Sequence, residues 1–208
     1  MQHLDLFSGI GGFAIAARSV GWRTIGFCEI DHFCLRLLGR RFDTHRWFSL
    51  PGHLNGGAAE GIVGLEEFVS VRPTWLVIEN DFHRWRAWMP ELRRRLWSLG
   101  YASLPLRVRA SEVGAVHHRA RGWLVANPNG EPLRELSRWW SREGGAVAQE
   151  LASTWDSAPR GLGTNHGLPD WVDRRHALGN AIVPRAAELI FHGIKQVIES
   201  SADQGALK

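Results

Sequence analysis

The chain has 208 residues, with 25 lysines and arginines against 21 aspartates and glutamates, which gives a formal net charge of +4. This length suits one domain with a complete core, and we expect neither a membrane-spanning helix nor a secretion signal, because the apolar runs are short and the chain leads at once into a strand. Two cysteines, Cys28 and Cys34, make neither a disulfide framework nor a metal cluster, so we expect a cytoplasmic protein without a bound metal.

The first predicted element is a strand over residues 4–8, followed by a glycine-rich turn and a helix over 13–20. The stretch reads "LDLFSGIGGF". Strand, glycine turn and helix in this order are typical of nucleotide-type ligand sites. Glycine lets the backbone approach a ligand closely, and the new helix offers free N–H groups. The same pattern also serves as a simple packing turn, so this stretch alone leaves both interpretations open.

A second strand is predicted over residues 24–28, and a helix follows over 31–41. Glu29 stands directly after this strand, about twenty residues after the glycines, where an acid can bind the hydroxyls of a ribose. A solvated acid at a strand end is the alternative. The glycine turn and the spaced acid together favour a ligand that contains ribose.

The rest of the chain alternates between predicted helices and strands. Residues 43–64 are rich in Gly, Pro, Asn and His, which indicates a loop or a degenerate crossover. The further elements are a helix at 65–73, a strand at 74–80, a helix at 89–99, strands at 102–110 and 121–127, and a long helix from Pro184. This alternation predicts an α/β fold with a doubly wound, mainly parallel sheet.

Residues 128–170 are polar, glycine-rich and poorly periodic, which predicts a small irregular insertion or a mobile region. We therefore expect a core over 1–127, an insertion over 128–170, and a final segment over 171–208 that completes the core.

Five motifs stand in one fixed order and together resemble the DNA cytosine-5 methyltransferases. "DLFSGIGGF" resembles their S-adenosylmethionine loop, and "CEID" resembles the adenosine-binding motif. "RPTWLVIEN" resembles the strand that carries their target-base glutamate. "SEVGAVHHRARGWLVAN" resembles the segment with a Gln-x-Arg-x-Arg core, and "HALGNAIVPRAAELI" resembles the closing motif. The resemblance implies the Rossmann-like fold of S-adenosylmethionine-dependent methyltransferases, with 128–170 in the place of a reduced target-recognition domain.

The resemblance also implies a binding site for S-adenosylmethionine or S-adenosylhomocysteine. Glu29 is then expected on the ribose and Ile30 against the adenine, while Asn180 and Ile182 close the methionine end. The residues expected to line this cofactor site are Phe7, Gly9, Gly11, Gly12, Glu29, Ile30, Asn180 and Ile182.

A second implied site receives a cytosine that has left the DNA stack. Glu79 is expected to bind the ring nitrogen and exocyclic amine, and Arg121 the carbonyl oxygen, while Arg119 supports the pocket or a phosphate. Alternatively, Glu79 lies at the edge of the core and the arginines are ordinary surface residues without a ligand. The arginine clusters and the basic net charge fit DNA as a partner, bound mainly through its phosphates.

The nucleophile that the resemblance requires is missing from the sequence. Such enzymes attack cytosine with a cysteine thiolate from a Pro-Cys loop. No Pro-Cys pair occurs in this chain, and residues 43–64 look shortened where the loop should lie. The acid that usually follows the third strand and contacts the adenine amine is missing as well, and Ser49 is the residue nearest to its place. Asp81 and His117 also depart from the family pattern, where an apolar residue and a glutamine are usual.

Three hypotheses remain open. The chain binds cofactor and DNA without methylating alone, as a pseudoenzyme related to restriction–modification proteins. Alternatively, it uses non-cysteine chemistry, with His45, His53 or Asp81 as a base. In the third hypothesis it is a partner subunit whose catalytic loop comes from a second chain, or a decoy that acts through protein–protein contacts.

Overall fold

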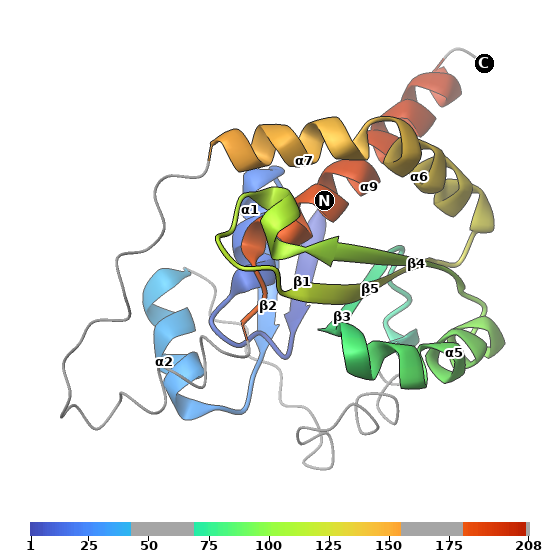
Figure 1. Ribbon diagram of the computed structural model, residues 1–208. Coiled ribbons are helices and arrows are strands. Elements are labelled where there is room, and N and C mark those ends of the chain that lie inside the picture. Colours follow the sequence, from blue (N-terminus) through green and yellow to red (C-terminus); the bar gives the residue numbers. More distant parts are fainter. Residues whose placement is uncertain (43–68, 155–180, 207–208) are drawn as a thin grey trace, which may run out of the picture. The chain divides into compact units, whose positions relative to one another are not determined.

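The computed structural model describes residues 1–42, 69–154 and 181–206 (Figure 1). The chain divides into two compact units, each described by itself. The first unit falls within Met1–Leu50 and Thr154–His192, and the second within Pro51–Ser153 and Gly193–Lys208. In the described residues, no helix is both long and apolar enough to cross a membrane.

The first unit contains a strand–helix–strand motif. Strand β1 (Gln2–Leu6) and strand β2 (Arg23–Cys28) pair in parallel and are joined through helix α1 (Gly12–Ser19), and helix α2 (His32–Arg41) follows. A small core forms between these elements from Ala14, Phe27, Leu38 and Phe42. These four elements lie within two residues of their predicted bounds.

Helix α9 (Pro184–Ala206) begins at the proline that the sequence indicates as its first turn. Its residues up to His192 belong to the first unit. There the Phe191 ring lies 4.8 Å from the ring of Trp22 and 5.8 Å from that of His3, centroid to centroid. His3 also shares a hydrogen bond with the Thr24 hydroxyl at 3.0 Å, and burial lowers its pKa to about 4.

The second unit is built on a three-stranded antiparallel sheet. Strands β3 (Leu76–Asp81), β5 (Ala120–Asn127) and β4 (Ala102–Arg109) are neighbours in that order. The short helix η1 (Ala110–Val113) lies on the connection between β4 and β5. In its described residues this unit also contains the helices α5 (Phe82–Ser98), α6 (Gly130–Arg142) and α7 (Gly144–Ser153).

Helices cover both faces of this antiparallel sheet, with α5 and α6 on opposite sides (Figure 1). On one face, Trp85, Leu92 and Leu96 of α5 pack with Leu124 and Ala126 of β5. Because neighbouring strand residues alternate between faces, the fully buried Trp123 and Val125 belong to the other face. There, α6 contacts β4 and β5, and its Leu133, Leu136 and Trp139 are buried.

Two sequence predictions need correction. The α/β class is right, but in the described residues only β1 and β2 pair in parallel, while β3, β5 and β4 are antiparallel, so the mainly parallel sheet is not found there. The irregular insertion is wrong for 130–153, which forms α6 and α7; the rest of that stretch lies outside the described residues. Helix α6 buries Leu133, Leu136 and Trp139, whereas its many exposed arginines and glutamates make the sequence look polar and irregular.

Candidate functional site

The glycine loop of the first unit, residues 7–12, is fastened to the end of β2 through Ser8. The Ser8 N–H donates to the Cys28 carbonyl at 3.0 Å, and the Cys28 N–H donates to the Ser8 hydroxyl at 3.2 Å. The same hydroxyl donates to the Asp5 carbonyl at 2.8 Å. These bonds hold the loop against the two strand ends where the ligand site is expected.

Glycine is required at Gly11 for two reasons. Its φ of +87° is in the left-handed region, and a Cβ there would lie 2.6 Å from the Phe42 ring. At the neighbouring Gly12, a Cβ would lie 2.5 Å from Cγ1 of Ile182. The first unit therefore brings Ile182, from the closing motif, directly against the glycine loop.

Glu29 is bound to the backbone of this loop. Its Oε2 accepts the Gly9 N–H at 2.5 Å, and its Oε1 accepts the N–H groups of Ile30 and Asp31 at 2.8 and 2.9 Å. Since a carboxylate has about four acceptor positions, roughly one remains, on Oε2, for a ligand hydroxyl. The acid and the glycine turn, which the spacing predicts as one site, are thus in direct contact.

Two apolar side chains close in sequence to Gly9 and Glu29 are exposed. Phe7 is 50 % exposed and Ile30 is 58 % exposed. Phe7 also has a φ of +54°, which is unusual for a bulky residue and stores backbone strain. Exposed apolar groups beside a polar loop suit a flat, partly apolar ligand such as an adenine ring.

Asp5 is a buried acid that the sequence reasoning missed. It lies in β1 with only 1 % exposure, and its carboxylate oxygens accept no well-aligned hydrogen bond from the described residues. Burial raises its pKa well above the ordinary value, an effect that the Ala14 N–H opposes and the Glu29 charge increases. The signal was available, because an acid inside the apolar run "LDLF" is unusual. Such a carboxylate suits a ligand that brings N–H or ammonium donors.

The second unit holds an acid–arginine site, which we define as Glu79, Asp81 and Arg121. Arg121 of β5 lies opposite Asp81 of β3 in the sheet register. Its Nε lies 2.7 Å from Glu79 Oε1, and its Nη1 lies 2.5 Å from Asp81 Oδ2. The side chains of Arg121 and Glu79 are 15 % and 13 % exposed, and that of Asp81 is 42 % exposed. Glu79 and Arg121, expected on the same base, are therefore neighbours.

Glu79 has unusual protonation chemistry. Burial raises its pKa to about 7, against the opposing charge of Arg121 and with a further upward contribution from Asp81. Its Oε1 is fully buried and accepts no well-aligned hydrogen bond, so the contact with Arg121 is a close ion pair only. Near neutral pH, this carboxyl can thus exist in either protonation state.

Asp81 links the acid–arginine site to helix α5. Its Oδ1 accepts the His83 N–H at 3.0 Å as the helix N-cap, while Oδ2 pairs with Arg121. The sequence reasoning considered this residue only as a base. An acid at a strand end is a candidate helix N-cap, but its pairing with Arg121 depends on the strand register.

Other predicted site residues lie elsewhere. Arg119 precedes β5 and its carbonyl accepts the Ala110 N–H at 2.9 Å, while His117 is exposed. Cys28 and Cys34 are both buried in the first unit. Residues that fall outside the described part of the chain are His45, Ser49, His53 and Asn180.

Asp81→Asn is expected to lower the pKa of Glu79, because it removes a negative charge while the amide oxygen keeps the N-cap. A raised pKa in the folded state means that the native protein holds a proton that the unfolded chain releases. The contribution of Glu79 to the free energy of unfolding therefore falls as the pH rises from about 4.5 to about 7. The variant should make this fall shallower, as measured by urea denaturation across that range.

The matched control is Asp31→Asn, which changes the N-cap of α2, where Oδ1 accepts the Cys34 N–H at 2.8 Å, in the other unit. This control should leave the pH dependence due to Glu79 unchanged. An unaltered pH profile in Asp81→Asn would contradict the assigned role.

Comparison with known proteins finds similarity at the level of structure. No protein-family profile matches the chain, and no curated protein does. A triple mutant of DNMT2 from Spodoptera frugiperda matches with a TM-score of 0.50 and 15 % identity, over 61 % of this chain and 49 % of that one. The Entamoeba histolytica methyltransferase EhMeth matches with a TM-score of 0.48 and 16 % identity, over 62 % of this chain and 53 % of its own.

The S. pombe Dnmt2 methyltransferase matches with a TM-score of 0.47 and 15 % identity, over 61 % of this chain and 49 % of its own. The chain thus spans about half the length of these solved structures. At such identities the likeness concerns the fold alone. The match to the Spodoptera structure shows that the chain has an α/β fold of the methyltransferase type.

Proposed function

We propose that this chain binds S-adenosylmethionine or S-adenosylhomocysteine at the glycine loop. The observation that carries the proposal is the Gly9–Glu29 contact, which joins the glycine turn and the spaced acid in one hydrogen-bonded unit. The exposed Phe7 and Ile30 beside it fit an adenine, and the buried Asp5 carboxylate fits a ligand with nitrogen donors. When bound, S-adenosylmethionine supplies an activated methyl group.

We further propose that the acid–arginine site receives a cytosine from DNA. A base that leaves the stack needs a polar pocket that replaces its lost hydrogen bonds. Glu79 offers a buried carboxyl oxygen without a well-aligned partner, and Arg121 offers guanidinium donors next to it. The pKa of Glu79, about 7, suits contact with a ring nitrogen that changes its own protonation.

Methylation by the isolated chain does not follow from this proposal, because the sequence contains no Pro-Cys nucleophile. A partner subunit that supplies a catalytic loop is the second candidate function. The observation that favours it is the absence of a Pro-Cys pair from a sequence that keeps Glu79 and Arg121. Non-cysteine chemistry stays open as well, with Asp81 as the described acid that reaches solvent beside Arg121.

Glu29→Ala is expected to weaken cofactor binding by about 1–3 kcal/mol, because the ligand loses a charged acceptor and Gly9 loses its anchor. Isothermal titration calorimetry with S-adenosylhomocysteine measures this loss directly. The cofactor-induced rise in thermal stability gives a second readout, since a ligand of the native state stabilises it in proportion to its affinity.

The control variant is Glu131→Ala, which removes an exposed glutamate of α6 that pairs with Arg134. It should bind the cofactor as the wild type does. Absence of any heat and any thermal shift with the wild-type chain would refute cofactor binding.

A further inference from the structure

The outer face of helix α5 carries an exposed tryptophan. Leu92 and Leu96 of this helix are 2 % and 0 % exposed and belong to the core, whereas Trp97 is 73 % exposed. A single exposed apolar residue is ordinary on a protein surface, so the significance of Trp97 depends on the charged side chains that surround it.

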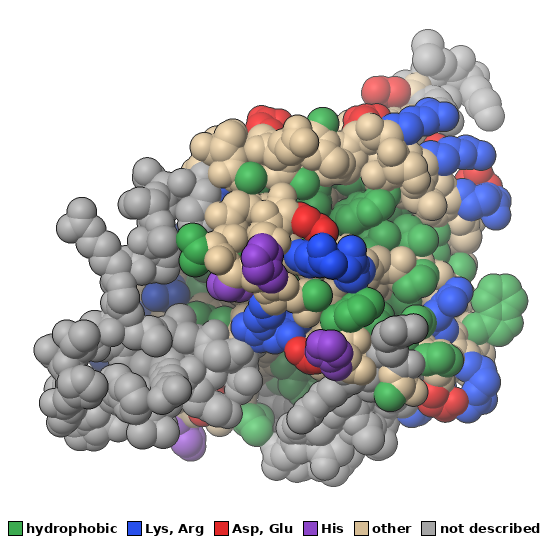
Figure 2. All heavy atoms as spheres, in the orientation of Figure 1, with side chains coloured by type: hydrophobic (Ala, Val, Ile, Leu, Met, Phe, Trp, Pro, Cys, Tyr) green, Lys and Arg blue, Asp and Glu red, His purple; other side chains and the backbone are tan. Residues whose placement is uncertain are grey.

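Arginines flank this tryptophan at helical spacing. Arg93 and Arg94 precede Trp97 by one turn, the spacing at which side chains on a helix are neighbours. The Nε of Arg93 donates to the Ser103 hydroxyl at 3.3 Å, and Arg94 is held by Glu91 through two contacts, at 2.6 and 3.0 Å. We call Arg93, Arg94 and Trp97 the Arg–Trp face. Figure 2 shows basic side chains beside a projecting hydrophobic one over α5.

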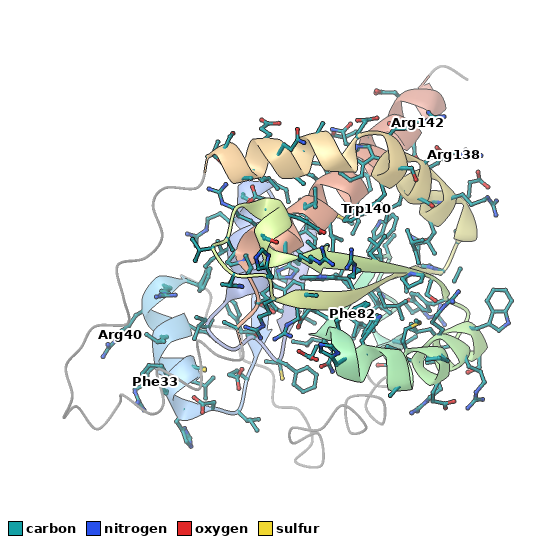
Figure 3. All side chains as sticks on the ribbon, in the orientation of Figure 1. Phe33, Arg40, Phe82, Arg138, Trp140 and Arg142 are labelled. Atoms are coloured by element: carbon teal, nitrogen blue, oxygen red, sulfur yellow. The ribbon has the colours of Figure 1, made fainter. Side chains whose placement is uncertain are left out.

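The Arg–Trp face has an excess of positive charge. Arg93, Arg94 and Arg95 stand in sequence on α5 against one acid of that helix, Glu91. On α6, Arg134 and Arg138 are each paired with a glutamate three residues earlier, as Arg94 is with Glu91, so α5 differs in its additional Arg93 and Arg95. Arg138 and Arg142 project outward from α6 (Figure 3), so exposed arginines alone do not distinguish the two helices. What distinguishes α5 from α6 is its excess of positive charge together with the exposed indole of Trp97.

We propose that the Arg–Trp face of α5 binds single-stranded nucleic acid, with Trp97 stacked on an unpaired base and the arginines on flanking phosphates. An aromatic platform within a positive surface is the arrangement that binds single strands without sequence preference. Paired bases in a duplex are stacked on one another and are closed to an indole. This proposal rests on the proposed function only in that the macromolecular ligand is a nucleic acid.

The experiment uses the full chain and fluorescein-labelled oligothymidylate, read by fluorescence anisotropy, with a labelled duplex of equal length in parallel. The wild type should bind the single strand more tightly. Trp97→Ala should weaken binding about 5- to 150-fold, the loss of one base stack. Arg93→Gln with Arg94→Gln should also weaken binding and flatten its dependence on salt, because fewer counterions are released.

The matched control is Arg134→Gln with Arg138→Gln on α6, which should bind within about twofold of the wild type. All these side chains are exposed, so circular dichroism should be unchanged. Wild-type affinity in Trp97→Ala would overturn the proposal, as would equal, Trp97-dependent binding of the duplex. Trp97-dependent binding to phosphatidylglycerol vesicles without binding to the strand would also overturn it. Failure here leaves the calorimetric test of cofactor binding untouched.

Discussion

Incubated with DNA that contains 5-fluorocytosine, the isolated chain is expected to form no covalent complex, and bisulfite sequencing is expected to reveal no newly protected cytosine. The family that the motifs resemble forms its adduct through a cysteine thiolate. This chain has only Cys28, fully buried in β2, and Cys34, 5 % exposed in α2. Both thiols are buried, so neither is accessible to a base.

The expected loss of rate is large. Removing a nucleophile that acts as a unit with its pocket costs several powers of ten. A hydroxyl such as that of Ser49 is a poor replacement, because it is far less ionised than a thiol at neutral pH. If the acid–arginine site receives a base as proposed, no conversion of that base is expected.

The double variant Cys28→Ser with Cys34→Ser serves as the control. It should match the wild type in both assays. A trapped complex that survives this double variant would establish non-cysteine chemistry, and one that disappears would assign the nucleophile to one of these two residues. Adding a candidate partner chain and regaining methylation would support the partner-subunit function.

Sequence reasoning located the elements best where glycine and helix caps mark their ends. β1, α1, β2 and α2 are separated by the glycine turn and by Asp31, which caps α2. Helix α5 was predicted to begin near Pro90 but begins at Phe82, because Asp81 caps it and the proline is tolerated inside. Proline usually stands in the first turn of a helix. In α5, the packing of the helix stabilises a proline in the interior.

The antiparallel sheet could also have been inferred more closely. A parallel pair needs a crossover of about a dozen residues or more, usually a helix. Only the short helix η1 lies between the end of β4 at Arg109 and the start of β5 at Ala120. Strand alternation alone does not distinguish the two directions, whereas the length of this connection favours the antiparallel one.

The candidate site was predictable in part. The spacing predicts that Glu29 and Gly9 belong to one site, but not their direct hydrogen bond, and the resemblance implies that Glu79 and Arg121 lie close together. Arg121 also pairs with Asp81 because the strand register places the two residues opposite each other. A shift of the register by one residue would turn the side chains of one strand to the other face of the sheet. Register is a tertiary property that single-sequence patterns do not contain.

Gly122→Ala is expected to lower the free energy of unfolding by about 1–3 kcal/mol or more, the usual range for overpacking a core. A Cβ at Gly122 would lie 2.2 Å from Cγ of Trp85 and 2.4 Å from its Cδ1. Trp85 is 2 % exposed and packs in the cluster with Leu92 and Leu124. Because the Trp85 ring is buried in this cluster, it has no free space into which to rotate, and the helix must move away from the sheet.

Such a movement should reach the acid–arginine site, since Gly122 follows Arg121 and α5 begins at the Asp81 cap. Urea denaturation measures the stability loss, and the pH dependence due to Glu79 reports whether the ion pairs persist. Gly145→Ala is the control: no atom lies within 4 Å of its Cβ position in α7, so alanine should raise stability by about 0.5–1 kcal/mol. A smaller partner, as in Gly122→Ala with Trp85→Leu, should recover part of the loss, whereas an unchanged midpoint in Gly122→Ala would show that α5 does not pack on β5 in this way.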